Sequence, residues 1–202
     1  KPDQEAVPSR QFDISKIDFD LLSREFTHTR RKNLLLRDLD ELVNQQLSKM
    51  LFANPRRIDY YDRYQEIIDA YNAEQNRATI EKTFMDLMEL ASSLDTEQQR
   101  YVREGFSSDE ELSVYDLLFS ENLTKQEIET IKKVSVDLLT KIKQQIAKLD
   151  HWTDKQETKA IVDNLIRNTL WQELPNSYDV SDIQTYQKKI YEYVYMRYPE
   201  VA

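Results

Sequence analysis

Apolar residues recur at steps of three and four along most of this 202-residue chain. That spacing places them on one face of a helix, whereas no stretch shows a convincing strand alternation. The pattern predicts an all-α protein, a multi-helix bundle of roughly eight helices with no sheet. The stripes are Leu22 and Phe26; Leu36, Leu39, Val43, Leu47 and Met50; Tyr60, Tyr64, Ile67, Ile68 and Tyr71; Ile80, Phe84, Leu87, Met88, Ala91 and Leu94; Ile128, Ile131, Val134 or Ser135, Leu138, Ile142, Ile146 and Leu149; Ile161, Leu165, Asn168 or Thr169, and Trp171; and Ile183, Tyr186, Ile190 and Val194.

Polar residues mark where these helices start and stop. Asn54-Pro55 ends one helix, since the residue before proline is pushed out of the α region, and Asp59 is placed to cap the next. Gly105 follows a short helical segment, so we expect it to have positive φ at a helix C-terminus. A hydroxyl residue followed three positions later by Glu or Gln predicts five further helix starts: Thr96 with Gln99, Ser108 with Glu111, Thr124 with Glu127, Thr153 with Gln156, and Ser181 with Gln184.

The beginning of the chain differs from the rest. Residues 1–17 contain two prolines, mixed charge and little periodicity, which is typical of a linker from upstream domains, whereas residues 18–202 form the helical domain. Because the first residue is Lys1 rather than methionine, we expect this to be the C-terminal piece of a longer polypeptide.

Composition excludes most chemistry. Gly105 is the single glycine, so no phosphate-binding loop can be written. Cysteine is absent, and His28 and His151 alone cannot supply an imidazole-rich metal site. No apolar run approaches a membrane span, and the net charge of −9 argues against a DNA-wrapping surface. We expect a cytoplasmic protein that binds no membrane and no cofactor of its own.

Three short motifs carry weak chemical signals. Residues 157–159 read Glu-Thr-Lys, the E-x-K form of magnesium nucleases, but a solvated helix face explains them better. The acidic run 109–111 fits attraction to a helix N-terminus better than a metal cluster. His151-Trp152 is most simply a core plug between two helices. We assign no catalytic residue and no metal ligand.

Two surface features are candidates for binding. Arg30, Arg31, Lys32, Arg56 and Arg57 could contact DNA phosphates, although neighbouring acidic residues favour internal ion pairs or an acidic partner.

The last helix carries Tyr191, Tyr195 and Tyr198 on a stripe rotated by about 100° from its main apolar face. Burial on a broad arc would explain a second apolar stripe. A half-exposed tyrosine face would instead be an interface, because tyrosine supplies large contact area with a polar tip.

From about residue 19 to the end, the order of several segments resembles the C-terminal helical domain of the restriction (R, motor) subunit of type I restriction-modification enzymes. The ordered combination is more specific than any single segment. The segments are residues 31–33, 54–59, 64–68, 71–72, 97–105, 109–112, 115–118, 123–124, 150–152 and 193–195.

The resemblance implies a parent subunit with a nuclease domain, two helicase-like motor lobes and this helical domain last. That subunit would cleave DNA with Mg²⁺ and translocate it with ATP, together with methylase and specificity subunits. No nuclease or ATPase motif of the family has a matching position here. The resemblance implies a non-catalytic domain that docks the motor onto the methylase core. The alternatives are a DNA-contacting domain, or a brace against the motor lobes of the same chain.

Overall fold

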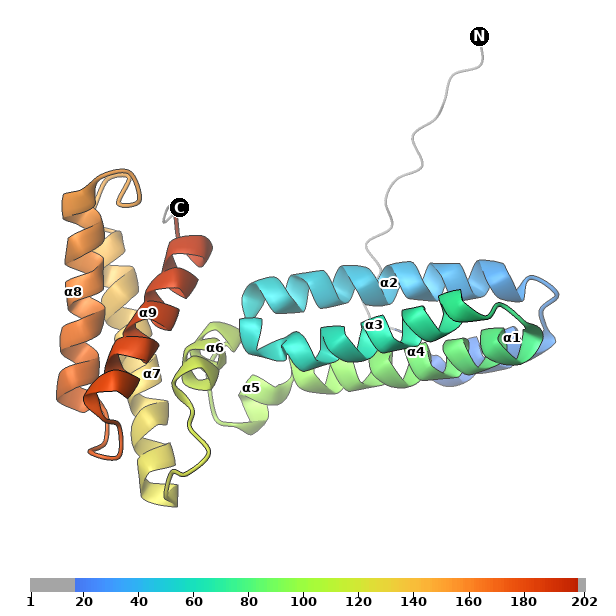
Figure 1. Cartoon of the computed structure of the whole chain (residues 1–202), viewed down its shortest axis with the longest axis horizontal. Helices are drawn as coiled ribbons and strands as arrows, with labels where there is room; N and C mark the ends of the chain where they lie inside the picture. Colours follow the sequence, from blue (N-terminus) through green and yellow to red (C-terminus); the bar gives the residue numbers. More distant parts are fainter. Residues whose placement is uncertain (1–16, 200–202) are drawn as a thin grey trace, which may run out of the picture. The chain divides into compact units, whose positions relative to one another are not determined.

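The computed structural model describes residues 17–199 (Figure 1). Within that range it contains nine α-helices, one short 3₁₀ helix and no strand, which confirms the all-α prediction. The expected linker, residues 1–17, lies outside the described residues except for Ile17. No helix among residues 17–199 is long and apolar enough to cross a membrane.

The chain divides into two compact units. The N-terminal unit comprises Lys1–Met50 and Arg57–Gln98, and the C-terminal unit comprises Leu51–Arg56 and Gln99–Ala202. Each unit has its own hydrophobic core, so each is described separately.

The described part of the N-terminal unit holds helices α1 (Phe19–His28), α3 (Ile58–Ala73), α4 (Arg77–Gln98) and most of α2 (Lys32–Ala53). The side chain of Asp18 accepts the Leu21 amide and caps α1. Helices α3 and α4 pack together, and the rings of Phe26 and Phe84 stack with centroids 3.7 Å apart. The core consists of Phe26, Leu36, Leu39, Leu42, Val43, Leu47, Met50, Tyr64, Ile67, Phe84, Leu87, Met88, Leu90, Ala91 and Leu94.

The C-terminal unit holds α5 (Arg100–Arg103), α6 (Asp109–Leu118), α7 (Lys125–Ile146), α8 (Gln156–Glu173) and α9 (Val180–Arg197). Helix α6 packs on α7, α7 on α8, α8 on α9, and α9 back on α6. These four helices therefore surround one core.

The helix starts confirm two of the five expected caps. Thr124 and Glu127 form a full capping box, and the Ser108 hydroxyl accepts the Glu111 amide. The other three predictions are wrong. Thr96 lies inside α4 and donates to the Ser92 carbonyl, because the helix simply continues past it.

Three other helices begin at residues that differ from the expected caps. Asp179 and Asp182 form the capping box of α9, so that helix begins before Ser181. Lys155, not Thr153, stands at the start of α8. Asp59 is also not a cap: a 3₁₀ turn, η2 (Pro55–Arg57), leads directly into α3.

Gly105 confirms its prediction, with φ of +84° directly after α5. The Phe106 amide donates to the Tyr101 carbonyl at 2.9 Å, and the Gly105 amide donates to the Val102 carbonyl at 3.1 Å. These two hydrogen bonds make a Schellman motif, which satisfies carbonyls left free at the helix end.

The predicted buried stripe of α8 is right in its middle and wrong at both ends. Thr169 is buried and Leu165 packs against the core, but Ile161 is 43% exposed and Trp171 is 50% exposed. Both possible faces carry apolar residues at helical spacing, so periodicity could not choose between them, and packing against α7 and α9 decides. The buried face consists of Val162, Ile166, Thr169 and Leu170.

Candidate docking surface

Helix α9 presents a buried face and a tyrosine face. Its buried residues are Ile183, Ile190, Tyr193 and Val194. The capping box at Asp179 fixes where the helix begins, and therefore which side chains turn away from the core. Tyr191, Tyr195 and Tyr198 lie along the border of this buried face. We call these three residues the aromatic face.

Trp152 supports the aromatic face from beneath. Its side chain is 1% exposed, and its ring meets Tyr191 and Tyr195 edge-on, with centroids 6.2 and 5.7 Å away. Its indole nitrogen donates to the Tyr198 carbonyl at 2.6 Å. The expected core plug is confirmed for Trp152 but is wrong for His151, whose side chain is exposed. His151 instead occupies the turn, with φ of 46°.

A polar contact fixes the far end of the aromatic face. The Tyr198 hydroxyl donates to Glu110 at 2.8 Å, and Lys143 donates to the other oxygen of the same carboxylate. Burial alone would raise the pKa of Glu110, but the hydrogen bonds from Lys143 and Tyr198 outweigh it and hold that pKa below its ordinary value. Burial, with the neighbouring Tyr193 and Glu110, raises the pKa of Tyr198, which keeps the hydroxyl a donor.

Exposure differs along the aromatic face. Tyr195 is 40% exposed, and the adjacent Met196 is 69% exposed. Tyr191 and Tyr198 are half-buried and pack against the core, and burial raises the pKa of Tyr191. The sequence did not reveal the part played by Met196 or Glu110, because only the fold brings Glu110 to α9.

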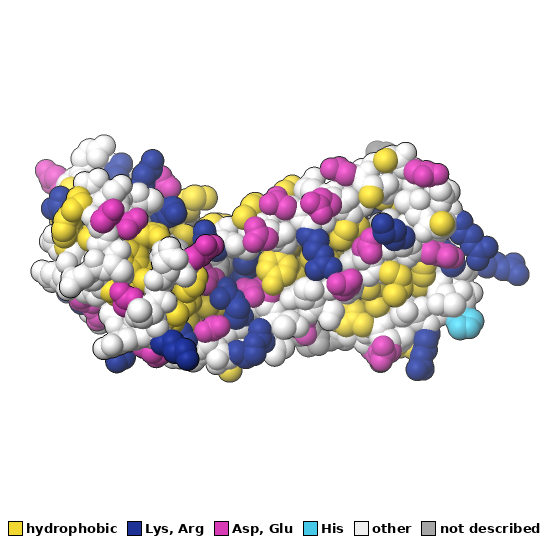
Figure 2. All heavy atoms as spheres, turned by 60° about the horizontal axis from the view of Figure 1, so that its bottom comes forward, with side chains coloured by type: hydrophobic (Ala, Val, Ile, Leu, Met, Phe, Trp, Pro, Cys, Tyr) yellow, Lys and Arg dark blue, Asp and Glu magenta, His cyan; other side chains and the backbone are white. Residues whose placement is uncertain are grey.

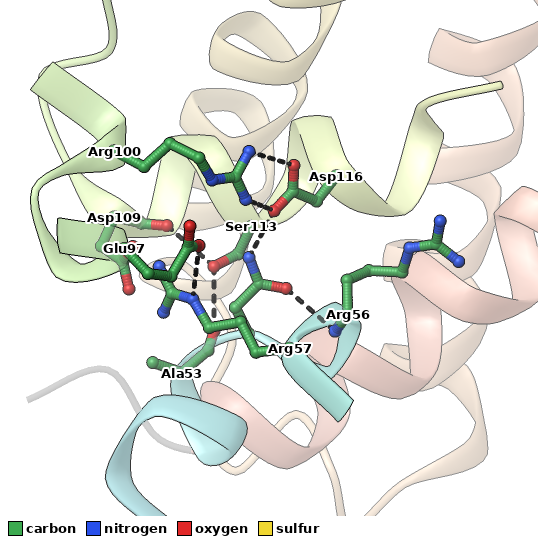
Figure 3. Close-up of polar contacts among 9 residues, drawn as sticks. Ala53, Arg56, Arg57, Glu97, Arg100, Asp109, Ser113 and Asp116 are labelled. Atoms are coloured by element: carbon green, nitrogen blue, oxygen red, sulfur yellow. Dashed lines mark hydrogen bonds and ion pairs between the residues drawn. The ribbon is translucent and has the colours of Figure 1, made fainter. Parts of the chain in front are cut away.

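The five basic candidates do not form one cluster. Lys32 donates to Glu81 at 2.7 Å, and Arg57 is buried, with Nε 3.0 Å from the Glu97 carboxylate (Figure 3). Both therefore serve internal ion pairs. Arg30 and Arg31 are exposed in the N-terminal unit, whereas Arg56 is exposed in the C-terminal unit.

A polar network that the sequence did not reveal holds the first segment of the C-terminal unit to α6. The Asp116 carboxylate accepts hydrogen bonds from Asn54 at 2.6 Å and from Arg100 at 3.0 Å (Figure 3). The Ser113 hydroxyl contacts the Ala53 carbonyl at 2.9 Å. Asn54 thus ends α2 and also anchors it, a role that the Asn-Pro signal alone could not show.

The weak chemical motifs lie on helix ends. Glu157 is exposed and Lys159 half-buried in the first turns of α8, and residues 109–111 occupy the first turn of α6. No group of three or more potential metal ligands occurs anywhere in the described range.

Comparison with known proteins gives one match. The family model for the C-terminal domain of type I restriction enzyme HindI endonuclease subunit-like proteins matches residues 5–198. No curated protein and no solved structure matches the chain.

Proposed function

The chain belongs to the family of C-terminal domains of type I restriction enzyme HindI endonuclease subunit-like proteins, and from that premise we propose that it docks such a subunit onto the methylase and specificity subunits. In this proposal the chain is a non-catalytic assembly domain. ATP-dependent translocation and Mg²⁺-dependent cleavage of DNA belong to other parts of the subunit.

The aromatic face of α9 is the observation that supports docking most directly. Tyr195 and Met196 expose apolar area to solvent, while Trp152 and the Glu110 contact hold the tyrosines in place. Preorganised aromatic side chains lose little conformational entropy on binding, and tyrosine is enriched where interfaces gain most of their energy.

Tyr195 of this face and the adjacent Met196 are the residues that best separate docking from core packing. Tyr191 is half-buried and rests on Trp152, so its removal would loosen the unit. Tyr195 also meets the Trp152 ring edge-on but is 40% exposed, and Met196 is 69% exposed, so replacing these two should cost about 1 kcal/mol of unfolding free energy and leave the unit folded. A loss of association in that variant therefore reports on the interface.

The experiment mixes the 202-residue chain with purified methylase–specificity core and measures complex formation by size-exclusion chromatography. We expect the wild-type chain to co-elute with the core, and Tyr195→Ser/Met196→Ser to fail to co-elute although it stays folded and its melting temperature falls only slightly. Tyr191→Ser/Tyr195→Ser should lose association as well, with a lower melting temperature.

The matched control removes two exposed apolar side chains elsewhere in the same unit. Ile161→Ser/Val180→Ser should co-elute like the wild type. If this control fails to co-elute while the Tyr195/Met196 variant binds, the docking face includes Ile161 or Val180 and not the aromatic face. If the wild-type chain binds isolated motor lobes but not the core, the domain is a brace.

A further inference from the structure

Cationic side chains gather at the end of the N-terminal unit where α1 turns into α2. Arg24 and His28 lie one helical turn apart near the end of α1, and Arg30 and Arg31 form the turn itself. All four are exposed. We call these four residues the basic tip, and Figure 2 shows dark blue and cyan side chains together at this end of the unit.

The basic tip is not neutralised by its surroundings. Glu81 is already paired with Lys32 at 2.7 Å and with Arg77 at 3.2 Å. Among residues 17–199, no ion pair involves Arg30 or Arg31. Glu25 borders the same shallow hollow as Arg31, and the exposed Asp20 lies one helical turn before Arg24, so the two carboxylates do not balance the three arginines. A concentrated positive potential therefore stands out on a chain whose net charge is −9.

Local hydrogen bonds hold the basic tip in shape. The Thr29 amide donates to the Glu25 carbonyl at 2.9 Å, and the Arg31 amide donates to the Thr29 hydroxyl at 3.1 Å. A ring nitrogen of His28 lies 2.8 Å from the Arg24 carbonyl. The backbone that carries these four side chains is thus held in place, so no loop must become ordered on binding.

We propose that the basic tip contacts the phosphodiester backbone of duplex DNA. Arginine donates well-directed hydrogen bonds to phosphate oxygens, and each neutralised phosphate releases bound counterions. The contact is independent of base sequence, since nothing at this end is shaped to enter a groove and read base edges. It would hold DNA close to the subunit while the docking face binds protein.

The chemistry of the basic tip favours nucleic acid over an acidic protein. A specific protein interface needs an apolar centre that excludes water. Phe26 is 5% exposed and stacked in the core, and the apolar residues beside Arg31 are Leu34, which is 41% exposed, and the half-buried Leu35. Two leucines give little of the apolar centre that a protein interface needs, so charge must supply most of the binding, as it does along a phosphate backbone.

The test measures fluorescence anisotropy of a labelled duplex of random sequence titrated with the 202-residue chain at several salt concentrations. We expect weak, salt-dependent binding that falls at least tenfold in Arg24→Gln/Arg30→Gln/Arg31→Gln. Removing three phosphate contacts should also reduce the slope of log K against log[salt] by about 2.7.

The matched control carries the same loss of charge on exposed cations of the C-terminal unit. Lys125→Gln/Lys148→Gln/Arg167→Gln should bind within twofold of the wild type. An equal loss in both variants would overturn the proposal, because net charge alone would then set affinity. Competition by polyglutamate as effective as competition by DNA would overturn it in favour of an acidic protein. Circular dichroism checks that each variant is folded, and the outcome is independent of docking by α9.

Discussion

The two units differ in a buried contact and in an exposed group. The N-terminal unit buries an ion pair, Arg57 with Glu97, and exposes the arginines of the basic tip. The C-terminal unit buries Trp152 at the centre of an aromatic group and exposes Tyr195. Both units are bundles of helix-forming residues, so composition alone cannot explain the contrast. The residues that differ lie near helix ends, as Arg57 does before α3 and Tyr195 does in the last turn of α9.

The largest loss of stability is expected at one of the two tryptophans of the C-terminal unit, and a small loss at the other. Trp152 is 1% exposed, so Trp152→Ala leaves a cavity and should cost about 4 kcal/mol of unfolding free energy. Trp171 is 50% exposed, and Trp171→Ala should cost less than about 1 kcal/mol. Urea unfolding followed by circular dichroism measures both. Similar losses would mean that Trp152 does not organise the unit.

The second largest loss of stability is expected from breaking the buried ion pair of the N-terminal unit. Arg57→Gln leaves the Glu97 carboxylate without its buried cation and should cost about 3 kcal/mol. Arg63→Gln is the control, because Arg63 pairs with Glu89 at the surface and should cost less than about 1 kcal/mol. Chemical denaturation of the two variants gives the comparison. Equal costs would contradict the assignment of Arg57 to the interior.

A smaller effect follows from the turn after α5. Gly105→Ala should cost about 1 kcal/mol, because a Cβ opposes positive φ. An added Cβ would meet no atom within 4 Å, so the cost is conformational rather than steric. Gly105→Asn should cost less, since asparagine tolerates the left-handed region. Thermal unfolding would contradict this ranking if asparagine destabilised more than alanine.

The smallest effect depends on pH. Hydrogen bonds from Lys143 and Tyr198 outweigh burial and lower the pKa of Glu110 from its ordinary value of 4.5. The carboxylate therefore stabilises the folded state at neutral pH, and this contribution disappears as pH falls below 4.5 through the lowered pKa. Glu110→Gln should be less stable than the wild type at pH 7, with the difference shrinking towards pH 3. A difference that stays constant would show that ionisation of Glu110 is not the cause.

The fold class could be predicted because helical periodicity and helix-forming composition agree over most of the chain. The conformation of Gly105 and the caps at Ser108 and Thr124 were also readable, since each is a local interaction. Thr96 and Ser181 failed because a hydroxyl can equally bond to a carbonyl inside a helix, or lie beside a stronger acidic cap.

The surfaces were harder to predict than the helices. Periodicity put the tyrosines of α9 on a second stripe, but it could not show that Trp152 supports them, since the two segments meet only through the fold. The basic residues form two short runs in the sequence, 30–32 and 56–57, yet Lys32 and Arg57 have internal partners that lie 49 and 40 positions away. Pairing over such separations carries no local signal, so exposure could not be inferred.

Two methionines test the docking proposal within a single sample. Met196 lies beside the aromatic face and is 69% exposed, whereas Met85 lies on α4 of the N-terminal unit and is 56% exposed. Hydroxyl-radical footprinting with mass spectrometry measures the oxidation of both, with and without the methylase–specificity core. Docking through α9 predicts that the core suppresses oxidation of Met196 several-fold and leaves Met85 unchanged. Unchanged oxidation of Met196 in a saturated complex would contradict docking through this face.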